Sequence, residues 1–186
     1  IAAEAIDMTT ISPREVFSFN QVVGMRSEEK GYLPGLMYSN GEVVSGIGGG
    51  ICMVSTMLYR GALESGLRIV ERHPHSGPVS YAAPGLDSAV SFGWADMRFK
   101  NCTDSPVLVR ARVENGELLV ALYGRKNPDR SFDIVSEGFE EIPYSIVEKE
   151  DPNVQPGEAE VEQQARAGYR VTIVRIHRKS GKETAR

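Results

Sequence analysis

The sequence predicts an α+β domain, in which one apolar helix with a cysteine at its N-terminus packs on a mainly antiparallel sheet. The helix is indicated by Met53–Ser65, where apolar residues recur at the three-four spacing of one helical face. The sheet is indicated by Asn40–Gly41 and Asn115–Gly116, because an Asn-Gly pair between strand-like segments favours a tight hairpin turn. A β-rich C-terminal extension is expected to follow the domain.

The predicted helix begins close to Cys52 and is expected to lie in the core. Its charged residues, Arg60 and Glu64, stand four apart and occupy one narrow stripe. A helix that is apolar on nearly all sides is buried rather than exposed. Gly66 suits the left-handed position that ends many helices. A glycine-rich turn, Gly46–Gly50, comes directly before the cysteine, and its residues can adopt backbone angles that are closed to others.

The segments around this helix predict short extended elements. Ile1–Met8 indicates the end of a helix, Glu15–Asn20 a short strand, and Leu36–Ser39 with Glu42–Ser45 the arms of a hairpin. The extended segments expected after the helix are Leu67–Val70, Val79–Tyr81, Asp87–Phe92, Trp94–Lys100, Val107–Glu114 and Glu117–Tyr123. Side chains of the last pair alternate between apolar and polar, which indicates one buried and one solvated face.

The character of the chain changes near residue 130, and we therefore predict a domain over 1–130 and a linker with a truncated β-rich extension over 131–186. Glu148–Gly157 is acidic and carries two prolines, which is typical of a linker. Further strands are expected at Phe132–Val135, Tyr144–Val147, Glu158–Gln164 and Tyr169–Arg178. The tail, Gly157–Arg186, is expected to pair as a short ribbon that docks on the domain or swaps with a neighbour.

Composition excludes several classes of function. The net charge of -4 and the lack of a basic stripe give no reason to expect a nucleic-acid partner. No apolar run approaches the ~20 residues that cross a membrane, so no span is expected in this fragment. The two cysteines fit neither a disulfide framework nor a four-ligand zinc motif. The chain does not begin with Met, which indicates an excised fragment without its signal or anchor.

The residues that predict chemistry are Cys52, His73, His75 and Asp87. A cysteine in the first turn of a helix lies at the positive end of the dipole, which favours the reactive thiolate. A thiol nucleophile also needs a histidine to move protons and a third group to orient the imidazole. We expect His75 to be the base, because Ser76 and Gly77 open a loop behind it, with His73 as the alternative. Asp87 is the expected orienting group, in an order that resembles transglutaminase-like and papain-like thiol enzymes.

Other interpretations of the same residues stay open. Cys52 alone would suit a small buried apolar position, which is common for free cysteine. Asp87 would suit a turn residue after Gly85, and Glu71 is a second possible orienting group. His73 and His75, with Cys52 or Asp87, also have the composition of a catalytic zinc site. Because no further histidine lies nearby, we rank this below thiol chemistry and predict neither a metal nor another cofactor.

Several separated segments together resemble the VanW family, first noticed beside vancomycin-resistance genes. The matching segments are Phe17–Asn20, Val23–Gly24 with Arg26, Gly46–Thr56 with Leu58–Tyr59, Glu71–His73, His75–Ser76, Pro84–Gly85 with Asp87, and Phe99–Asn101. The resemblance covers roughly Glu4 to Gly124. Met53 and Cys102 depart from the usual pattern, which has glutamine and a polar residue there. The tail resembles the connection into the five-glycine wall-associated domain.

The resemblance implies an extracellular or cell-surface protein of the Gram-positive envelope. Family members have been assigned L,D-transpeptidase activity, in which a cysteine takes an acyl group from a peptidoglycan stem peptide and passes it to an amine. The residues expected to contact such a substrate are Gly48, Gly49, Gly50, Ser55, Asn20 and Arg26. The alternative is a non-catalytic module that binds the cell wall or a peptide carboxylate through the glycine turn and the helix start.

Overall fold

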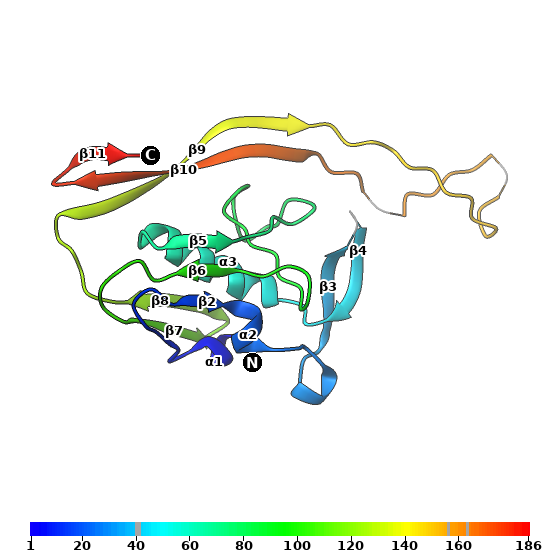
Figure 1. Ribbon diagram of the computed structural model, residues 1–186. Helices are drawn as coiled ribbons and strands as arrows, with labels where there is room; N and C mark the ends of the chain where they lie inside the picture. The colour runs from blue at the N-terminus through cyan, green and yellow to red at the C-terminus, as the bar shows by residue number, and fades with distance from the viewer. Residues whose placement is uncertain (40–41, 156, 163) are drawn as a thin grey trace.

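The computed structural model describes residues 1–39, 42–155, 157–162 and 164–186 (Figure 1). The fold is α+β, with mostly antiparallel sheets and few helices. A body formed by the first 123 residues carries a long ribbon that crosses over one side of it. The predicted hairpin turn at Asn40–Gly41 lies outside the described residues, although the two strands that flank it are described.

The helices all precede residue 65 within the described ranges. They are α1 (Ala2–Ile6), α2 (Phe19–Val23), the 3-10 helix η1 (Glu28–Lys30) and α3 (Ile51–Glu64). The longest of them, α3, has 14 residues and packs against β8, β5 and β9, which are described below. Its wholly buried side chains include Leu58 and Ala62. No helix in the described part of the chain is long and apolar enough to span a membrane.

Two small antiparallel sheets build the body on either side of α3. In one, β1 (Thr10–Ile11) pairs with β7 (Val107–Glu114), which pairs with β8 (Glu117–Tyr123). In the other, β6 (Arg98–Lys100) lies between β2 (Val16–Ser18) and β5 (Arg68–Glu71). The hydrophobic core fills the space between them and includes Ile6, Phe19, Leu58, Met97, Phe99 and Val109.

The hairpin of β3 (Pro34–Ser39) and β4 (Glu42–Ile47) stands beside the body and leads into the glycine turn before α3 (Figure 1). Its base touches this turn backbone to backbone. A Cβ atom placed on Gly35 would lie 2.7 Å from the Cα of Gly49, and one placed on Gly49 would lie 2.6 Å from the Cα of Gly35. No side chain therefore separates the hairpin from the turn at this point.

Four segments of the body depart from the predicted extended structure, and one of them, Trp94–Lys100, forms a strand only over Arg98–Lys100. The strand expected at Glu15–Asn20 ends at Ser18, because the Ser18 hydroxyl accepts the N–H of Gln21 and so caps α2. Val79–Tyr81 and Asp87–Phe92 form no strands, and the second makes isolated bridges at Ala89 and Ser91. Frequent prolines and glycines around them do not support a continuous ladder of hydrogen bonds.

The C-terminal ribbon is longer than predicted and has a different partner strand. β9 (Arg130–Ile142) pairs with β10 (Gly168–Lys179), and β10 turns back into β11 (Lys182–Ala185). The tail thus pairs within itself, through β10 and β11, and also with β9, which comes before the acidic segment. The expected strands at Tyr144–Val147 and Glu158–Gln164 are not formed in the described residues. The two long strands of the ribbon are therefore joined by a long connection without strands.

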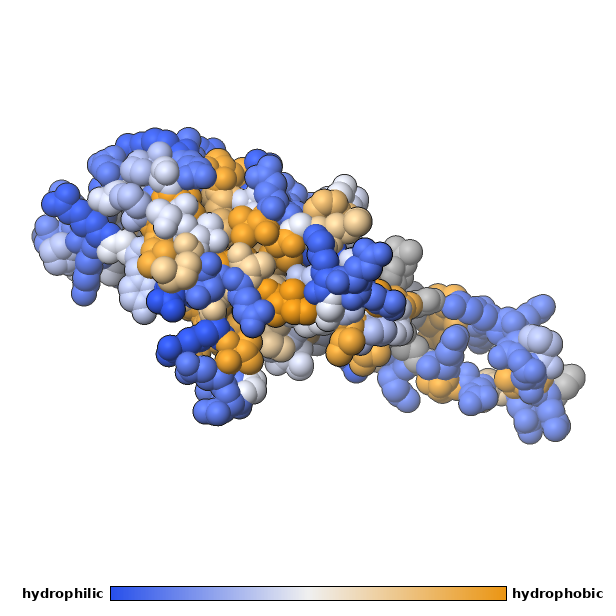
Figure 2. Space-filling view, turned by 90° about the horizontal axis from the view of Figure 1, so that it is seen from below, coloured by the Kyte–Doolittle hydropathy of each residue, from blue (hydrophilic) through white to orange (hydrophobic). Residues whose placement is uncertain are grey.

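The ribbon docks on the body at the C-terminal end of α3. Ile134 and Ile173 pack against the core, and the Arg175 guanidinium donates to the carbonyl of Leu67 at 2.6 Å. A Cβ atom on Gly66, whose φ is +73°, would lie 2.1 Å from the Phe132 ring, so only glycine allows this approach. In Figure 2, apolar residues gather in the middle of the body, whereas the segment that projects from it is mostly hydrophilic.

Candidate functional site

Cys52 is the second residue of α3, directly after a turn with left-handed glycines. The φ angles of Gly48 and Gly50 are +95° and +86°, and this conformation turns the chain sharply into the helix. The turn is closed by a hydrogen bond from the Ile51 N–H to the Gly48 carbonyl at 3.3 Å. Among the described residues, no acceptor lies within hydrogen-bond reach of the N–H groups of Gly49, Gly50 and Cys52. These donors remain available beside the thiol.

His75 is held on Asp87 by two contacts. Its ring Nδ1 lies 2.7 Å from Asp87 Oδ2, and its backbone N–H donates to the same oxygen, also at 2.7 Å. The His75 side chain is 6% exposed, so the imidazole has little freedom to turn. The Tyr81 hydroxyl lies 3.2 Å from the other ring nitrogen, Nε2. The carboxylate therefore fixes Nδ1, and Nε2, beside the Tyr81 hydroxyl, is the nitrogen that can exchange a proton.

The protonation of His75 reflects its neighbours. Burial alone would lower the pKa of His75, but hydrogen bonds to Asp87 and to the Cys52 side chain, together with their negative charges, raise it to about 9. The Cys52 side chain is thus among the groups that act on the His75 imidazole. A histidine that is protonated at neutral pH next to a cysteine favours the thiolate–imidazolium pair.

Arg72 completes the environment of Asp87 and is a residue that the sequence interpretation missed. Its Nη2 donates to Asp87 Oδ1 at 2.7 Å, and its Nε donates to the Asp87 backbone carbonyl, also at 2.7 Å. Burial would raise the pKa of Asp87, but hydrogen bonds from His75 and the Arg72 charge hold it below its usual range. The sequence feature that could have indicated this role is the position of Arg72 next to the two histidines. A buried carboxylate that orients a histidine needs a neighbouring positive charge.

A backbone group also faces the thiol, and no sequence signal could have shown it. The Val90 N–H lies 3.5 Å from Cys52 Sγ, and the Val90 carbonyl lies 3.8 Å from it. The segment around Val90 is held against α3 by hydrogen bonds between Ser88 and the side chains of Ser55 and Thr56. The thiol thus receives a backbone N–H donor in addition to the imidazole.

His73, the alternative base, lies in a different environment. Its Nε2 is 3.1 Å from Glu71 Oε1, and its ring centroid is 5.8 Å from that of Trp94. Glu71 also accepts the Asp96 N–H and pairs with Arg98, so it does not serve as the orienter of His75. The structure therefore brings together Cys52, His75 and Asp87 and directs His73 to a neighbouring ion pair.

Of the residues expected to contact substrate, Ser55 lies beneath the site, whereas Asn20 and Arg26 lie beside it. Ser55 is wholly buried, and its hydroxyl donates to the Ser88 carbonyl at 2.7 Å, which places it beneath the site rather than in it. Asn20 donates through Nδ2 to the carbonyls of Ser91 and Ala95, and its buried Oδ1 has no hydrogen-bond partner in the part of the chain that the structure describes. Arg26 extends along the turn, where a Cβ atom on Gly48 would lie 3.5 Å from the Arg26 Cβ.

Two hollows flank the site. One, of about 430 Å³, is lined by His75, Asp87 and the loop between them on one side and by Tyr169–Val171 of β10 on the other. The second, of about 520 Å³, is lined by residues that include Asn20, Phe92 and Trp94. Within the described ranges, no group of three or more His, Cys, Asp or Glu side chains is arranged to hold a metal ion. The chemistry that the arrangement offers is that of the thiol and imidazole.

On an α+β body, a cysteine at a helix start accompanies a histidine whose Nδ1 is held by a buried carboxylate. This arrangement is a candidate Cys-His-Asp site. The chain belongs to the VanW-like family, because the family model described as "VanW like protein" matches residues 1–123. A second model, described as "G5 domain", matches residues 136–186. Both matches confirm the resemblance drawn from the sequence motifs.

Two curated relatives support this assignment. The chain is 41% identical over 143 residues to "Uncharacterized protein YoaR" of Bacillus subtilis, a match that covers 77% of this chain and 45% of the relative. It is 28% identical over 141 residues to "Vancomycin B-type resistance protein VanW" of Enterococcus faecalis, covering 73% of this chain and 51% of the relative. The chain thus spans about half the length of these relatives. No solved structure matches it significantly.

Proposed function

We propose that the protein is a cell-envelope acyl-transfer enzyme that uses Cys52 as its nucleophile on peptidoglycan stem peptides. The observation that carries the proposal is the position of His75, whose Nδ1 lies 2.7 Å from Asp87 and whose pKa is raised by groups that include the Cys52 side chain. The proposal takes α3, with the cysteine at its N-terminus, as the central helix that organises the chemistry. It also divides the chain at residue 130, and the separate family matches support that division.

Each residue has a stated role in the proposed reaction. The Cys52 sulfur attacks the peptide carbonyl, and the thiol proton resides on His75. When the tetrahedral intermediate collapses, the C–N bond breaks, His75 gives its proton to the leaving amine, and an acyl-thioester remains on Cys52. An amine or water then attacks the thioester, transfers a proton through His75 and restores the thiol. Asp87 keeps the imidazole oriented throughout.

The unpaired N–H groups at the start of α3 suit the oxyanion of the tetrahedral intermediate. The N–H groups of Gly50 and Cys52 belong to the turn and first residues of the helix that carries the sulfur, and they donate to no backbone acceptor among the described residues. Donors that are oriented before reaction stabilise developing negative charge without reorganisation. The Gly48–Gly50 turn therefore contributes backbone donors, whereas Ser55 supports the turn from beneath.

The place of action follows from the family rather than from the site. A G5 domain match and a relative named for vancomycin resistance support a role at the Gram-positive cell wall, on the outside of the cell. Stem peptides are the substrate class that this location and the thiol chemistry share. The β9–β10 ribbon would then hold the catalytic body at the wall.

The test is a covalent adduct. Incubating the protein with a synthetic stem peptide should give an acyl-enzyme, detected by intact mass and mapped to Cys52 by peptide mass spectrometry. Cys52→Ala should give no adduct and no transfer to an amine, whereas Cys102→Ser should behave like the natural protein. An adduct elsewhere, or transfer by Cys52→Ala, would refute the thiol mechanism.

The second candidate function is a binding module without chemistry. It is favoured by the unpaired N–H groups at the start of the 14-residue helix α3, which suit a carboxylate. One experiment, incubation with the stem peptide followed by intact-mass measurement after denaturation, distinguishes the enzyme from the binding module. A binding module holds the stem peptide reversibly with and without the Cys52 thiol, and no mass increase survives denaturation.

A further inference from the structure

The Arg26 side chain carries a positive charge that has no hydrogen-bond partner in the described structure. Both terminal nitrogens, Nη1 and Nη2, are buried and unpaired. The guanidinium lies between two aromatic rings, 5.6 Å from the centroid of Phe19 and 5.9 Å from that of Phe92. Ring faces attract a cation, but they do not satisfy its N–H groups. A buried cation without an acceptor is unfavourable, which indicates that an acceptor is missing.

The nearest acid does not supply this acceptor. The charge of Asp96 acts to raise the pKa of Arg26. The Asp96 carboxylate, however, already accepts hydrogen bonds from the Ser18 hydroxyl at 2.5 Å and from the N–H groups of Asn20 and Met97 at 2.8 Å each. Burial lowers the pKa of the Arg26 guanidinium, and the neighbouring groups Tyr32, Cys52 and Asp96 oppose that effect. The net effect lowers the pKa of Arg26, and among the described residues no ion pair joins its guanidinium to the Asp96 carboxylate.

Arg26 lies along the turn that precedes Cys52 and beside the loop that carries Val90. Its stem runs along the turn before Cys52, since a Cβ atom on Gly48 would lie 3.5 Å from the Arg26 Cβ and Cγ. Its guanidinium touches Phe92, two residues after Val90, whose N–H faces the sulfur. A group bound by the guanidinium would therefore be joined to a carbonyl at Cys52 by only a short stretch of peptide.

We infer that Arg26 binds the terminal carboxylate of the peptide whose carbonyl Cys52 attacks, so that the residue released carries a free carboxylate. This rests on the proposed function for its substrate class. The planar guanidinium offers two parallel N–H groups that match the two oxygens of a carboxylate. A thiol beside such a site acts next to the peptide end rather than within the chain. An amidated end would offer one acceptor oxygen and no charge.

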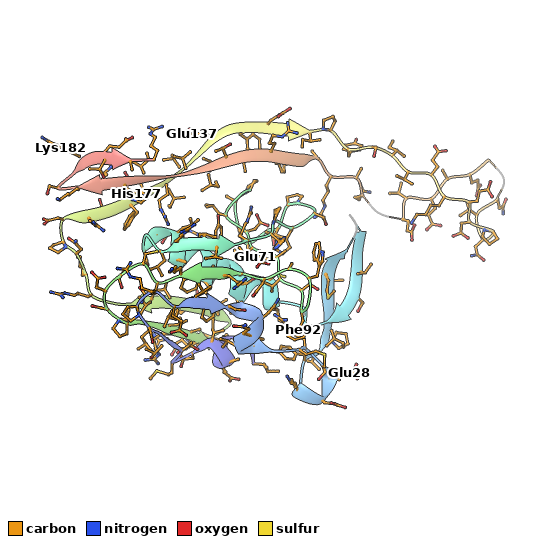
Figure 3. All side chains as sticks on the ribbon, viewed as in Figure 1. Glu28, Glu71, Phe92, Glu137, His177 and Lys182 are labelled. Carbon is orange, nitrogen blue, oxygen red and sulfur yellow. The ribbon has the colours of Figure 1, made fainter. Side chains whose placement is uncertain are left out.

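Asn20 and Phe92 complete the site. The Asn20 amide is oriented by its two Nδ2 hydrogen bonds, to Ser91 and Ala95, so its buried Oδ1 is an acceptor that suits the N–H of the terminal residue. Phe92 lines the hollow of about 520 Å³ and is 52% exposed, and it covers the guanidinium from that side. Figure 3 shows it between the body and the β3–β4 hairpin. A ligand reaches Arg26 from the hollow by displacing this ring.

The test measures binding to the full chain carrying Cys52→Ala, which cannot turn over. The probes are a synthetic peptide that ends in L-lysyl-D-alanine, as the free acid and as the carboxamide. The free acid should bind roughly 10- to 100-fold more tightly, because a charge-assisted hydrogen-bond pair forms only with the carboxylate. Adding Arg26→Met should bring the free acid to the level of the carboxamide. Arg98→Met, at an arginine that lines the same hollow, should leave the preference intact.

Stability separates recognition from a structural role. Removing an unpaired buried charge is neutral or stabilising, so Arg26→Met should keep or raise the melting temperature. Equal binding of the two probes, no binding of either, or a marked loss of stability in Arg26→Met would overturn the inference. None of these results bears on the thiol mechanism, which the Cys52 adduct tests separately. A preference for the free acid without an adduct would support Arg26 and refute acyl transfer.

Discussion

Cys52 and Cys102 lie in opposite surroundings, which leads to the first prediction. Cys102 is exposed, whereas Cys52 is half-buried and faces His75 and the Val90 N–H. Exposure alone would make Cys102 the faster thiol. Because hydrogen-bond donors and a cation favour the thiolate, we expect iodoacetamide to modify Cys52 first at pH 6. Peptide mass spectrometry over time measures both sites, and faster labelling of Cys102 would contradict the prediction.

The second prediction concerns the pH dependence of stability. The pKa of His75 is raised from 6.5 to about 9 in the folded protein. Its contribution is therefore fully present below pH 6.5 and is lost as the pH rises through about 9. A shift of this size corresponds to roughly 3 kcal/mol at most. We expect the free energy of unfolding in urea to fall over this window.

A pair of histidine variants assigns this effect. His75→Gln should remove most of the decline between pH 6.5 and 9, because the titrating group is gone. His73→Gln should keep it, since that ring bonds to Glu71 instead. If the two variants exchange these behaviours, the base has been assigned to the wrong residue.

The third prediction tests Arg72 as the support of Asp87. Arg72→Met removes two hydrogen bonds to a residue whose side chain is 9% exposed, and we expect a loss of roughly 1–3 kcal/mol of stability. Arg110→Met is the matched control, because its ion pair with Asp7 is more exposed and should contribute less than about 1 kcal/mol. Urea unfolding of both variants measures the difference. Equal losses would show that the Asp87 contacts are no more than a surface pair.

At the scale of elements, Gly66 joins the end of α3 to the ribbon, and this contact gives the fourth prediction. Gly66→Ala introduces both a left-handed alanine and a clash with Phe132. Gly116→Ala has the same backbone problem, at φ +81°, with open space around it. We expect about 1 kcal/mol of destabilisation at Gly116 and roughly 1–3 kcal/mol more at Gly66. If both variants lose the same free energy of unfolding in urea, the Phe132 ring moves away from position 66 at no cost.

The elements that the sequence predicted best are those with a strong local pattern. Val107–Glu114 and Glu117–Tyr123 form β7 and β8 with the predicted bounds, because strict alternation and an Asn-Gly turn fix the register. The strand expected at Asp87–Phe92 failed, since its residues are placed by long-range contacts with α3 and His73. The partner of the tail was also not predictable, because β9 and β10 are separated by a long connection.

In the candidate site, too, residues with recognisable chemistry were predicted from the sequence, whereas contacts that depend on the fold were not. The chain order of Cys52, His75 and Asp87 indicated the group that the structure brings together, since these side chains carry recognisable chemistry. Arg72 and the Val90 N–H were missed, because one resembled an ordinary strand arginine and the other is a backbone group. His75 was preferred over His73 from the sequence because of the loop after it, whereas its contact with Asp87 depends on how the chain folds between the two residues.

At the scale of the whole molecule, the ribbon contributes to the stability of the body, which gives the fifth prediction. Deleting residues 148–186 removes β10. The deletion takes away the packing of Ile173 against the core and the hydrogen bond from Arg175 to the Leu67 carbonyl. The body keeps its own core, so we expect it to stay folded and cooperative. The lost burial should lower the melting temperature by roughly 5–15 °C.

Calorimetry of the shortened protein checks this outcome. Arg175→Met in the full chain should show a smaller decrease, because it removes the polar contact and keeps the apolar one. Loss of a cooperative transition after the deletion would mean that the body depends on the ribbon to fold.

The contact between Gly35 and Gly49 restricts how this protein can vary. Each of them lies where any side chain would meet the main chain of the other, within 2.6–2.7 Å. A change at one position cannot be rescued by a smaller residue at the other, because glycine is already the smallest. The hairpin and the turn that carries the backbone donors beside Cys52 therefore form a single mutational unit. A combinatorial library over both positions, selected for the activity of the site, should return glycine at each.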